Sequence, residues 1–247
     1  FCFLDVHPPF NKRIVRGIIS ILAFLMDFQT FINCISKVND FPLPGKRGHA
    51  IMAPYSIRRL YLSNEEVFHH ENDSEYYQNA RKASVLLCFY EHKDELYLTL
   101  IKRTTYDGPH SGQISFPGGK PVSLDSSLWD TAKREFKEEL GVDLSSASPL
   151  LTLSRVYIPP SNFLVTPFVA VVKKKPFFHL DSREVALKID ISLYELIHLK
   201  IKQCPILEGN HKGVVVPCYV YEGHMIWGAT AMVLSEFILF LKERTII

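Results

Sequence analysis

The clearest pattern of hydrophobic and polar residues begins after residue 80. Two apolar, β-prone runs at residues 83–90 and 96–103 flank the charged sequence from His92 to Glu95, which predicts a β-hairpin. Apolar runs also predict strands at residues 151–157, 164–172, 185–189 and 214–221. Helical spacing predicts helices at residues 192–199 and 229–242. This order predicts an α/β (α+β) sandwich in which helices pack on a mixed β-sheet.

Another helix is predicted between the hairpin and the later strands. Leu128, Ala132, Phe136 and Leu140 recur at four-residue spacing, so one face of residues 127–140 is apolar. Gly141 directly follows, as is common where a helix ends.

The N-terminal third is less regular. Helical spacing at residues 26–38 predicts a short helix, and residues 63–79 are a polar segment in which we expect His69 and His70 to be solvated. An apolar run at residues 17–26 is too short to span a bilayer, and no small-residue cleavage pattern follows it. Since the first methionine is Met26, we hypothesise that residues 1–25 are an extension outside the functional protein. Residues 26–80 are then an N-terminal helix and lead-in, and residues 81–247 the main domain.

The composition shows that the protein has almost no net charge. The chain has 28 basic and 26 acidic residues and a formal net charge of +2, so no overall field attracts it to nucleic acid. The five cysteines are widely spaced and include no CxxC pair, which favours reduced thiols and a cytoplasmic protein over a disulfide framework or a zinc site. We expect no stable membrane insertion, and the sequence leaves open whether the protein forms a homodimer.

Three glutamates on the helix at residues 127–140 are the strongest sign of chemistry. Glu135, Glu138 and Glu139 stand at positions i, i+3 and i+4, so their carboxylates share one helix face beside the apolar stripe. Crowded carboxylates repel each other and lose solvation unless a cation or a base offsets the cost. Mg²⁺ or Mn²⁺ is the expected cation, because hard cations take oxygen ligands and bridge to substrate phosphates.

Residues around these glutamates extend the pattern. Arg134 can hold a neighbouring carboxylate with its planar guanidinium, which indicates an orienting role. Gly118 and Gly119 permit the backbone to approach phosphate oxygens closely. An acidic run on a helix is usually a solvated face, but the whole string from Phe116 to Val142 is far more specific than that.

This string resembles the Nudix box, G-x5-E-x7-R-E-u-x-E-E-x-G-u, in which u is a bulky aliphatic residue. Residues 134–142 match its second half, with Phe136 at the first u position. In the first half, Asp125 stands where the glutamate belongs, and the interval to Arg134 is one residue longer. The coenzyme A diphosphatase branch of the family shares this longer loop, and its upstream signature is similar to residues 110–119. The resemblance covers about residues 49–241.

The resemblance implies a Nudix-type α/β/α sandwich and a diphosphatase that uses Mg²⁺ or Mn²⁺ bound by Glu135, Glu138 and Glu139. It implies hydrolysis of CoA or acyl-CoA to 3′,5′-ADP and (acyl-)4′-phosphopantetheine. The adenosine 3′-phosphate would need a basic partner, for which Lys102, Arg103 and His110 are candidates. The general base is left open among Glu138, Glu139 and Glu184.

Two other functions compete with this interpretation. The branch has an arginine where this chain has Gly108, which keeps a Nudix diphosphatase acting on NADH, ADP-ribose or a damaged nucleotide in consideration. A non-catalytic Nudix-fold binding module is the second alternative. Aromatic residues such as Phe168 and Trp227 could stack on adenine, but aromatics at such positions usually belong to the core. The three lysines at residues 173–175 indicate a solvated loop.

Overall fold

The computed structural model describes residues 28–36, 42–62, 79–108, 110–207 and 212–244. The predictions for residues 1–25, and for His69 and His70, lie outside these ranges. Among the described residues, no helix is both long and apolar enough to cross a membrane.

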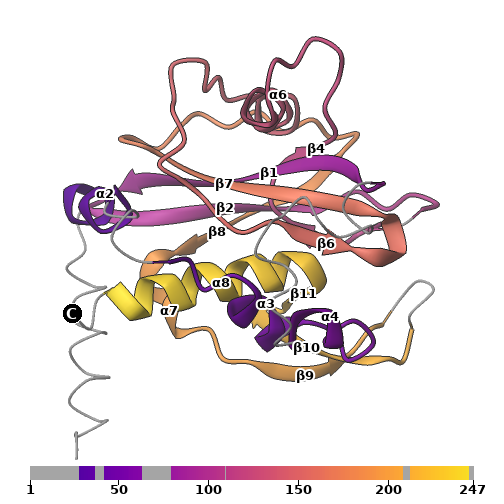
Figure 1. Ribbon diagram of the computed structural model, residues 1–247. Coiled ribbons are helices and arrows are strands. Elements are labelled where there is room, and N and C mark those ends of the chain that lie inside the picture. The colour runs from indigo at the N-terminus through magenta and orange to yellow at the C-terminus, as the bar shows by residue number, and fades with distance from the viewer. Residues whose placement is uncertain (1–27, 37–41, 63–78, 109, 208–211, 245–247) are drawn as a thin grey trace, which may run out of the picture.

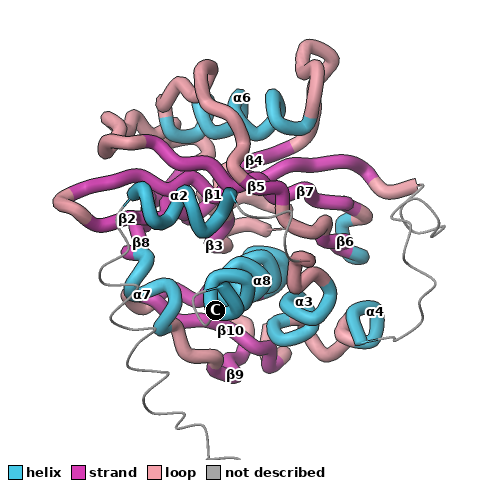
Figure 2. The backbone as a smooth tube through the Cα atoms, turned by 60° about the vertical axis from the view of Figure 1, so that its left-hand side comes forward, coloured by secondary structure: helices cyan, strands magenta, loops and turns pink. Residues whose placement is uncertain are grey.

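The molecule is built in layers around a mixed β-sheet (Figure 1). Helix α6 (Leu128–Leu140) covers one face of this sheet, and helix α8 (Gly228–Arg244) lies against the other face. A second, three-stranded sheet packs beneath α8, so that α8 lies between two sheets (Figures 1 and 2). The predicted sandwich of helices on a mixed sheet is confirmed, and the second sheet is a layer that the sequence did not indicate.

The predicted hairpin forms the centre of the large sheet. Strand β1 (Arg81–His92) pairs antiparallel with β2 (Glu95–Arg103) and parallel with β7 (Phe163–Val172), which makes the sheet mixed. Strand β8 (Val185–Ser192) pairs with β2. Short strands complete the sheet: β3 (Ile114–Ser115), β4 (Gly118–Gly119), β5 (Leu151–Thr152) and β6 (Val156–Ile158).

The two faces of the sheet carry separate apolar cores. On one face, the stripe of α6 packs on β1 through Ala132, Phe136 and Leu140, together with Leu86 and Cys88. On the other face, α8 buries residues around its whole circumference. A helix that is enclosed by two sheets needs no polar side, and this explains why its apolar pattern is broader than a single stripe.

The N-terminal helices join the α8 side of the molecule. Helix α2 (Phe28–Ser36) confirms the predicted helix, and its Phe31 packs against Phe89 and Phe237 with ring centroids 4.9 and 6.5 Å away. Helices α3 (Lys46–Met52) and α4 (Arg59–Leu62) follow, and α3 packs along α8. Helix α7 (Leu193–His198) confirms the helix predicted after β8 and begins with a capping box between Ser192 and Glu195.

The single strand predicted at residues 151–157 is wrong, because the chain forms β5 and β6 with a break between them. The break has a local cause. Within it, the Ser154 amide donates to Oε1 of Glu236 on α8 at 3.2 Å instead of joining a strand ladder. A buried carboxylate from a distant helix therefore interrupts the strand.

The prediction of reduced thiols is also wrong for one pair of cysteines. The small sheet is formed by β9 (Lys202–Pro205), β10 (Val215–Tyr221) and β11 (His224–Trp227). Its register places Cys204 opposite Val216, diagonal to Cys218, and these cysteines form a disulfide with Cα atoms 6.3 Å apart. The two cysteines come together only because β9 pairs with β10. The sequence analysis did not predict β9, so it could not predict this disulfide. Cys88 is a free, buried thiol, as expected.

Candidate functional site

Helix α6 carries the acidic cluster, and local signals fix both of its ends. The Ser127 hydroxyl accepts a hydrogen bond from the Asp130 amide at 3.1 Å and caps the N-terminus. Gly141 adopts a left-handed conformation with φ of 71° and donates its amide to the Lys137 carbonyl at 2.8 Å. The helix predicted at residues 127–140 is confirmed, and it sets the rotational position of the three glutamates.

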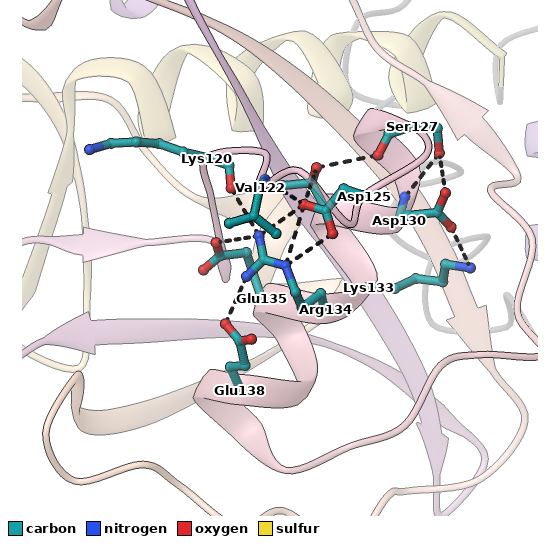
Figure 3. A network of polar contacts seen from close by, with 10 residues as sticks. Lys120, Val122, Asp125, Ser127, Asp130, Lys133, Arg134, Glu135 and Glu138 are labelled. Atoms are coloured by element: carbon teal, nitrogen blue, oxygen red, sulfur yellow. Dashed lines mark hydrogen bonds and ion pairs between the residues drawn. The ribbon is translucent and has the colours of Figure 1, made fainter.

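Arg134 is the centre of a polar network at this helix (Figure 3). Its Nε and Nη2 each lie 3.1 Å from a carboxylate oxygen of Asp125, and Nη2 also donates to the Lys120 carbonyl at 2.9 Å. Ion pairs at 2.9 and 2.8 Å connect the guanidinium to Glu135 and Glu138. The fixed fork of donors therefore holds three carboxylates and a backbone carbonyl in one arrangement.

Asp125, at the position of the first acid of the box, anchors this network. Its carboxylate also accepts hydrogen bonds from the Val122 amide at 3.0 Å and the Thr131 hydroxyl at 2.9 Å. The hydrogen bonds from Arg134 are the main cause of an Asp125 pKa lowered to about 2. Asp125 therefore stays ionised and fixes the guanidinium from the side opposite Glu138. A glutamate is not needed for this contact.

Glu139 is the most buried acid of the cluster, with 1% of its side chain exposed. Its carboxylate accepts the Gly118 amide at 3.0 Å and lies 3.4 Å from Nη1 of Arg103 on β2. Burial raises the pKa of Glu139 to about 8, and the negative charges of Glu135 and Glu184 act in the same direction. Burial also raises the pKa of Glu135. Both carboxyls are therefore harder to ionise than exposed ones, mainly because they are buried and secondarily because other acids lie nearby.

Two glycines allow β4 to pass close beneath α6. Gly118 has a φ of 150°, and a Cβ atom there would lie 2.2 Å from the Ser84 carbonyl oxygen. At Gly119, a Cβ atom would lie 2.4 Å from the carboxylate of Glu135. These distances explain why glycine is needed at both positions, since any larger residue would displace the acids or the strand.

The donor chemistry of the cluster suits a hard divalent cation, since Glu135, Glu138 and Glu139 offer carboxylate oxygens along one helix face. Glu139 is buried, and its cationic partner is Arg103, whose Nη1 lies 3.4 Å away. The described residues contain no group of three metal-binding side chains that already converge. Glu138, with 56% of its side chain exposed, would have to turn from Arg134 toward Glu139 to complete such a set.

The structure separates the basic residues that the sequence grouped together. Arg103 lies beside Glu139, but Lys102 is its neighbour on a strand and by alternation points to the opposite face of the sheet. His110 is exposed, and its Nδ1 contacts the Gln113 side chain at 3.1 Å rather than the acids. Of the open candidates for a general base, Glu184 lies close enough for its charge to raise the pKa of both Glu135 and Glu139.

The two aromatic residues considered for stacking on adenine, Phe168 and Trp227, lie in different parts of the molecule. Phe168 is 8% exposed and packs in the core against Trp129, with ring centroids 5.4 Å apart. Trp227 ends β11 in the small sheet, on the α8 side of the molecule. Residues 173–175 are exposed beyond the end of β7, as predicted for a solvated loop.

The contribution of the Lys120 carbonyl and the anchoring role of Asp125 were not foreseen. For Asp125 a signal existed, since an acid nine residues before Arg134 lies on the loop that leads into the same helix. A backbone carbonyl has no sequence signal at all.

Comparison with known proteins shows to which family the chain is related. The family model of the NUDIX domain matches residues 80–188, from the start of β1 into β8. Nudix hydrolase NudL of Yersinia enterocolitica is 36% identical over 163 residues, which are 64% of this chain and 80% of the relative. NudL of Yersinia pestis is 31% identical over 66% of this chain and 81% of the relative. The crystal structure of MutT protein from Methanosarcina mazei Go1 is similar over 64% of this chain and 91% of that chain, with 18% identity and a TM-score of 0.43.

The matched segment contains the whole network around Arg134 as well as Glu139 and Glu184. The relatives align over most of their own length, so the match is not confined to one motif. The chain therefore belongs to the Nudix hydrolase family and is a diphosphatase that acts on a nucleoside diphosphate derivative.

Proposed function

We propose that this protein hydrolyses CoA or acyl-CoA at the diphosphate, with a divalent metal, giving 3′,5′-ADP and (acyl-)4′-phosphopantetheine. The observation that carries the proposal is the buried Glu139 carboxylate, with its pKa raised to about 8, on the helix face that also bears Glu135 and Glu138. The likeness of residues 110–119 to the CoA diphosphatase branch supports the choice of substrate.

Glu135, Glu138 and Glu139 would hold Mg²⁺ or Mn²⁺. When bound, the ion polarises the diphosphate and lowers the pKa of water. Arg134 keeps Glu135 in place and Asp125 keeps Arg134 in place, while Glu138 would turn from Arg134 to reach the ion. Arg103 and the Gly118 amide contact the Glu139 carboxyl and favour its ionised form, which opposes the effect of burial on its pKa.

Glu184 is our choice as the group that accepts a proton from the attacking water. It lies outside helix α6, yet its charge acts on both Glu135 and Glu139. The three box glutamates are committed to the metal in this scheme, which leaves Glu184 as the carboxylate available for proton transfer.

The test is a substrate panel with CoA, acetyl-CoA, NADH and ADP-ribose in the presence of Mg²⁺, with products identified by mass spectrometry. We expect CoA to give 3′,5′-ADP and 4′-phosphopantetheine at the highest kcat/KM. The variant Glu139→Gln is the control for contaminating activity. If ADP-ribose or NADH is hydrolysed as fast as CoA, the CoA proposal is wrong and the broader Nudix diphosphatase remains. If no substrate is hydrolysed by the wild type while nucleotide still binds, the protein is a binding module.

A further inference from the structure

Two cations and an aromatic ring form a cluster where β1 and β7 begin. Arg81 and Phe163 are opposite each other in the parallel register of these strands, and the Arg81 Cζ lies 4.2 Å from the centre of the Phe163 ring. The Nζ of Lys120, directly after β4, lies 5.6 Å from the same ring. Three separate segments of the chain thus contribute to one small surface, which we call the Arg81–Lys120 cluster.

The position of the ring and of Arg81 is fixed by the loop before β7. The Tyr157 hydroxyl donates to the Asn162 side chain at 3.1 Å, and this side chain donates to the Asn79 carbonyl at 3.1 Å. The Arg81 amide donates to the Asn162 carbonyl at 2.9 Å, and its guanidinium donates to the Ser161 carbonyl at 2.6 Å. The guanidinium is therefore held in one orientation before any ligand arrives.

The positive charge of the cluster is not neutralised. Within the ranges that the structure describes, neither Arg81 nor Lys120 forms an ion pair with a carboxylate. Basic residues elsewhere around α6 do form such pairs: Arg103 with Glu139, Lys133 with Asp130, Arg134 with Asp125, and Lys137 with Asp143. Two unpaired cations around one ring give this surface a local positive charge, which favours the binding of an anion.

The cluster adjoins the acidic site across the edge of β4. The Lys120 carbonyl accepts a hydrogen bond from Arg134, while the Lys120 side chain extends away from that network (Figure 3). Gly119 faces Glu135, so strand alternation sends the next side chain, Lys120, to the other side of the strand. A ligand whose diphosphate lies at the glutamates can therefore cross this edge and reach Lys120 and Arg81 with a second group.

We propose that the Arg81–Lys120 cluster binds a phosphomonoester on the nucleoside portion of the substrate, remote from the diphosphate that is cleaved; this rests on the proposed function. A phosphomonoester carries a charge close to −2 and offers three acceptor oxygens. The guanidinium fork can donate to two of them, and the lysine to the third. A neutral base is a poorer match, because Arg81 already lies over the Phe163 ring.

Binding to the metal-free protein tests the cluster without turnover. Isothermal titration would compare 3′,5′-ADP with 5′-AMP, which differ only in the 3′-phosphate. We expect the wild type to bind 3′,5′-ADP at least about tenfold more tightly than 5′-AMP, as for a charge-assisted hydrogen bond. Lys120→Gln and Arg81→Gln should each weaken 3′,5′-ADP binding by about tenfold and leave 5′-AMP binding unchanged.

Matched controls exist elsewhere in the chain. Lys175 lies 5.9 Å from the Tyr90 ring, and Arg58 lies 4.4 Å from the Tyr55 ring and donates to the Ala53 carbonyl at 3.2 Å. The variants Lys175→Gln and Arg58→Gln remove the same charges from comparable contacts, and neither should change binding of either nucleotide. Equal losses in these controls would mean that net charge alone is responsible and would overturn the proposal.

The outcomes separate this inference from the proposed function. The inference is wrong if the wild type binds both nucleotides with equal affinity, or if the cluster variants lower both affinities equally. The cluster then does not recognise a second phosphate, whatever the enzyme hydrolyses. If the binding pattern holds and CoA is not hydrolysed, the proposed reaction fails while the phosphate site stands. When both are correct, the cluster variants raise KM for CoA but not for dephospho-CoA, with kcat little changed.

Discussion

Two buried glutamates on opposite sides of the sheet have different surroundings. Glu236 on α8 is fully buried, and its carboxylate accepts the amides of Gly45 and Ser154 at 3.1 and 3.2 Å and contacts His49 Nε2 at 2.9 Å. Glu139 on α6 is buried almost as completely, but has one amide partner and a 3.4 Å contact to Arg103.

The difference lies in what surrounds each carboxylate. Three parts of the fold supply the partners of Glu236: the segment before α3, α3 itself, and the break between β5 and β6. The carboxylate therefore joins these three parts. Around Glu139, other acids converge, and their charges contribute to its raised pKa. Burial alone therefore does not identify a functional acid. An acid that is buried among donors has its charge satisfied by the fold, whereas one that is buried among acids gains more from a cation, which is why we propose a metal at Glu139 and not at Glu236.

The largest effect is expected from removing the structural acid. Glu236→Ala would leave the amides of Gly45 and Ser154 and the His49 ring without their acceptor, and should lower the free energy of unfolding by about 3–5 kcal/mol. Glu236→Gln keeps an acceptor oxygen and should cost about 1–2 kcal/mol. Urea unfolding measures both. A loss below about 1 kcal/mol for the alanine variant would show that Glu236 does not join these segments.

The corresponding change at the functional acid should affect turnover and spare the fold. Glu139→Gln removes a proposed metal ligand, and kcat should fall by at least about 100-fold, since even groups that support ligands cost about 10- to 100-fold. The raised pKa of Glu139 means that it favours folding at low pH and that this contribution is lost as pH rises toward 8. At pH 9 the variant should therefore have a higher Tm than the wild type. A lower Tm with unchanged kcat would reverse the assignment of the two glutamates.

An intermediate effect is expected at the anchor of Arg134. Asp125→Asn keeps the shape of the side chain but weakens its hold on the guanidinium, so that Glu135 is less well oriented. We expect kcat to fall by about 10- to 100-fold. Asp143→Asn breaks an ion pair of 2.8 Å with Lys137 on the surface of the same region, and should leave kcat unchanged. Equal rates in the two variants would mean that Asp125 has no positioning role.

The last expected effect concerns the pH dependence of metal affinity. Glu139 must lose its proton to bind a cation, and its pKa is about 8 without metal. The apparent affinity for Mg²⁺ should therefore increase by about tenfold per pH unit between pH 6 and pH 8 and level off above that range. Titration calorimetry at several pH values measures this slope, which Glu139→Gln should abolish. Equal affinity at pH 6 and pH 8 would show that Glu139 does not bind the metal.

Local patterns were enough for the elements that border the site. The hairpin of β1 and β2 and the limits of α6 followed from apolar spacing and from Gly141, because these signals act over a few residues. The shared face of Glu135, Glu138 and Glu139 followed from helix geometry alone. The sequence of residues 118–142 was also sufficient to identify the family.

What the sequence did not determine depends on contacts between distant segments. Arg103 meets Glu139 from 36 residues away, and Glu236 reaches Ser154 from 82 residues away and interrupts a predicted strand. The disulfide between Cys204 and Cys218 and the gathering of Arg81 and Lys120 around the Phe163 ring likewise depend on contacts between separate strands. Periodicity reports which face of an element is apolar, but not which partner lies against it. Only the packed tertiary structure decided which buried acid is surrounded by hydrogen-bond donors and which lies among other acids.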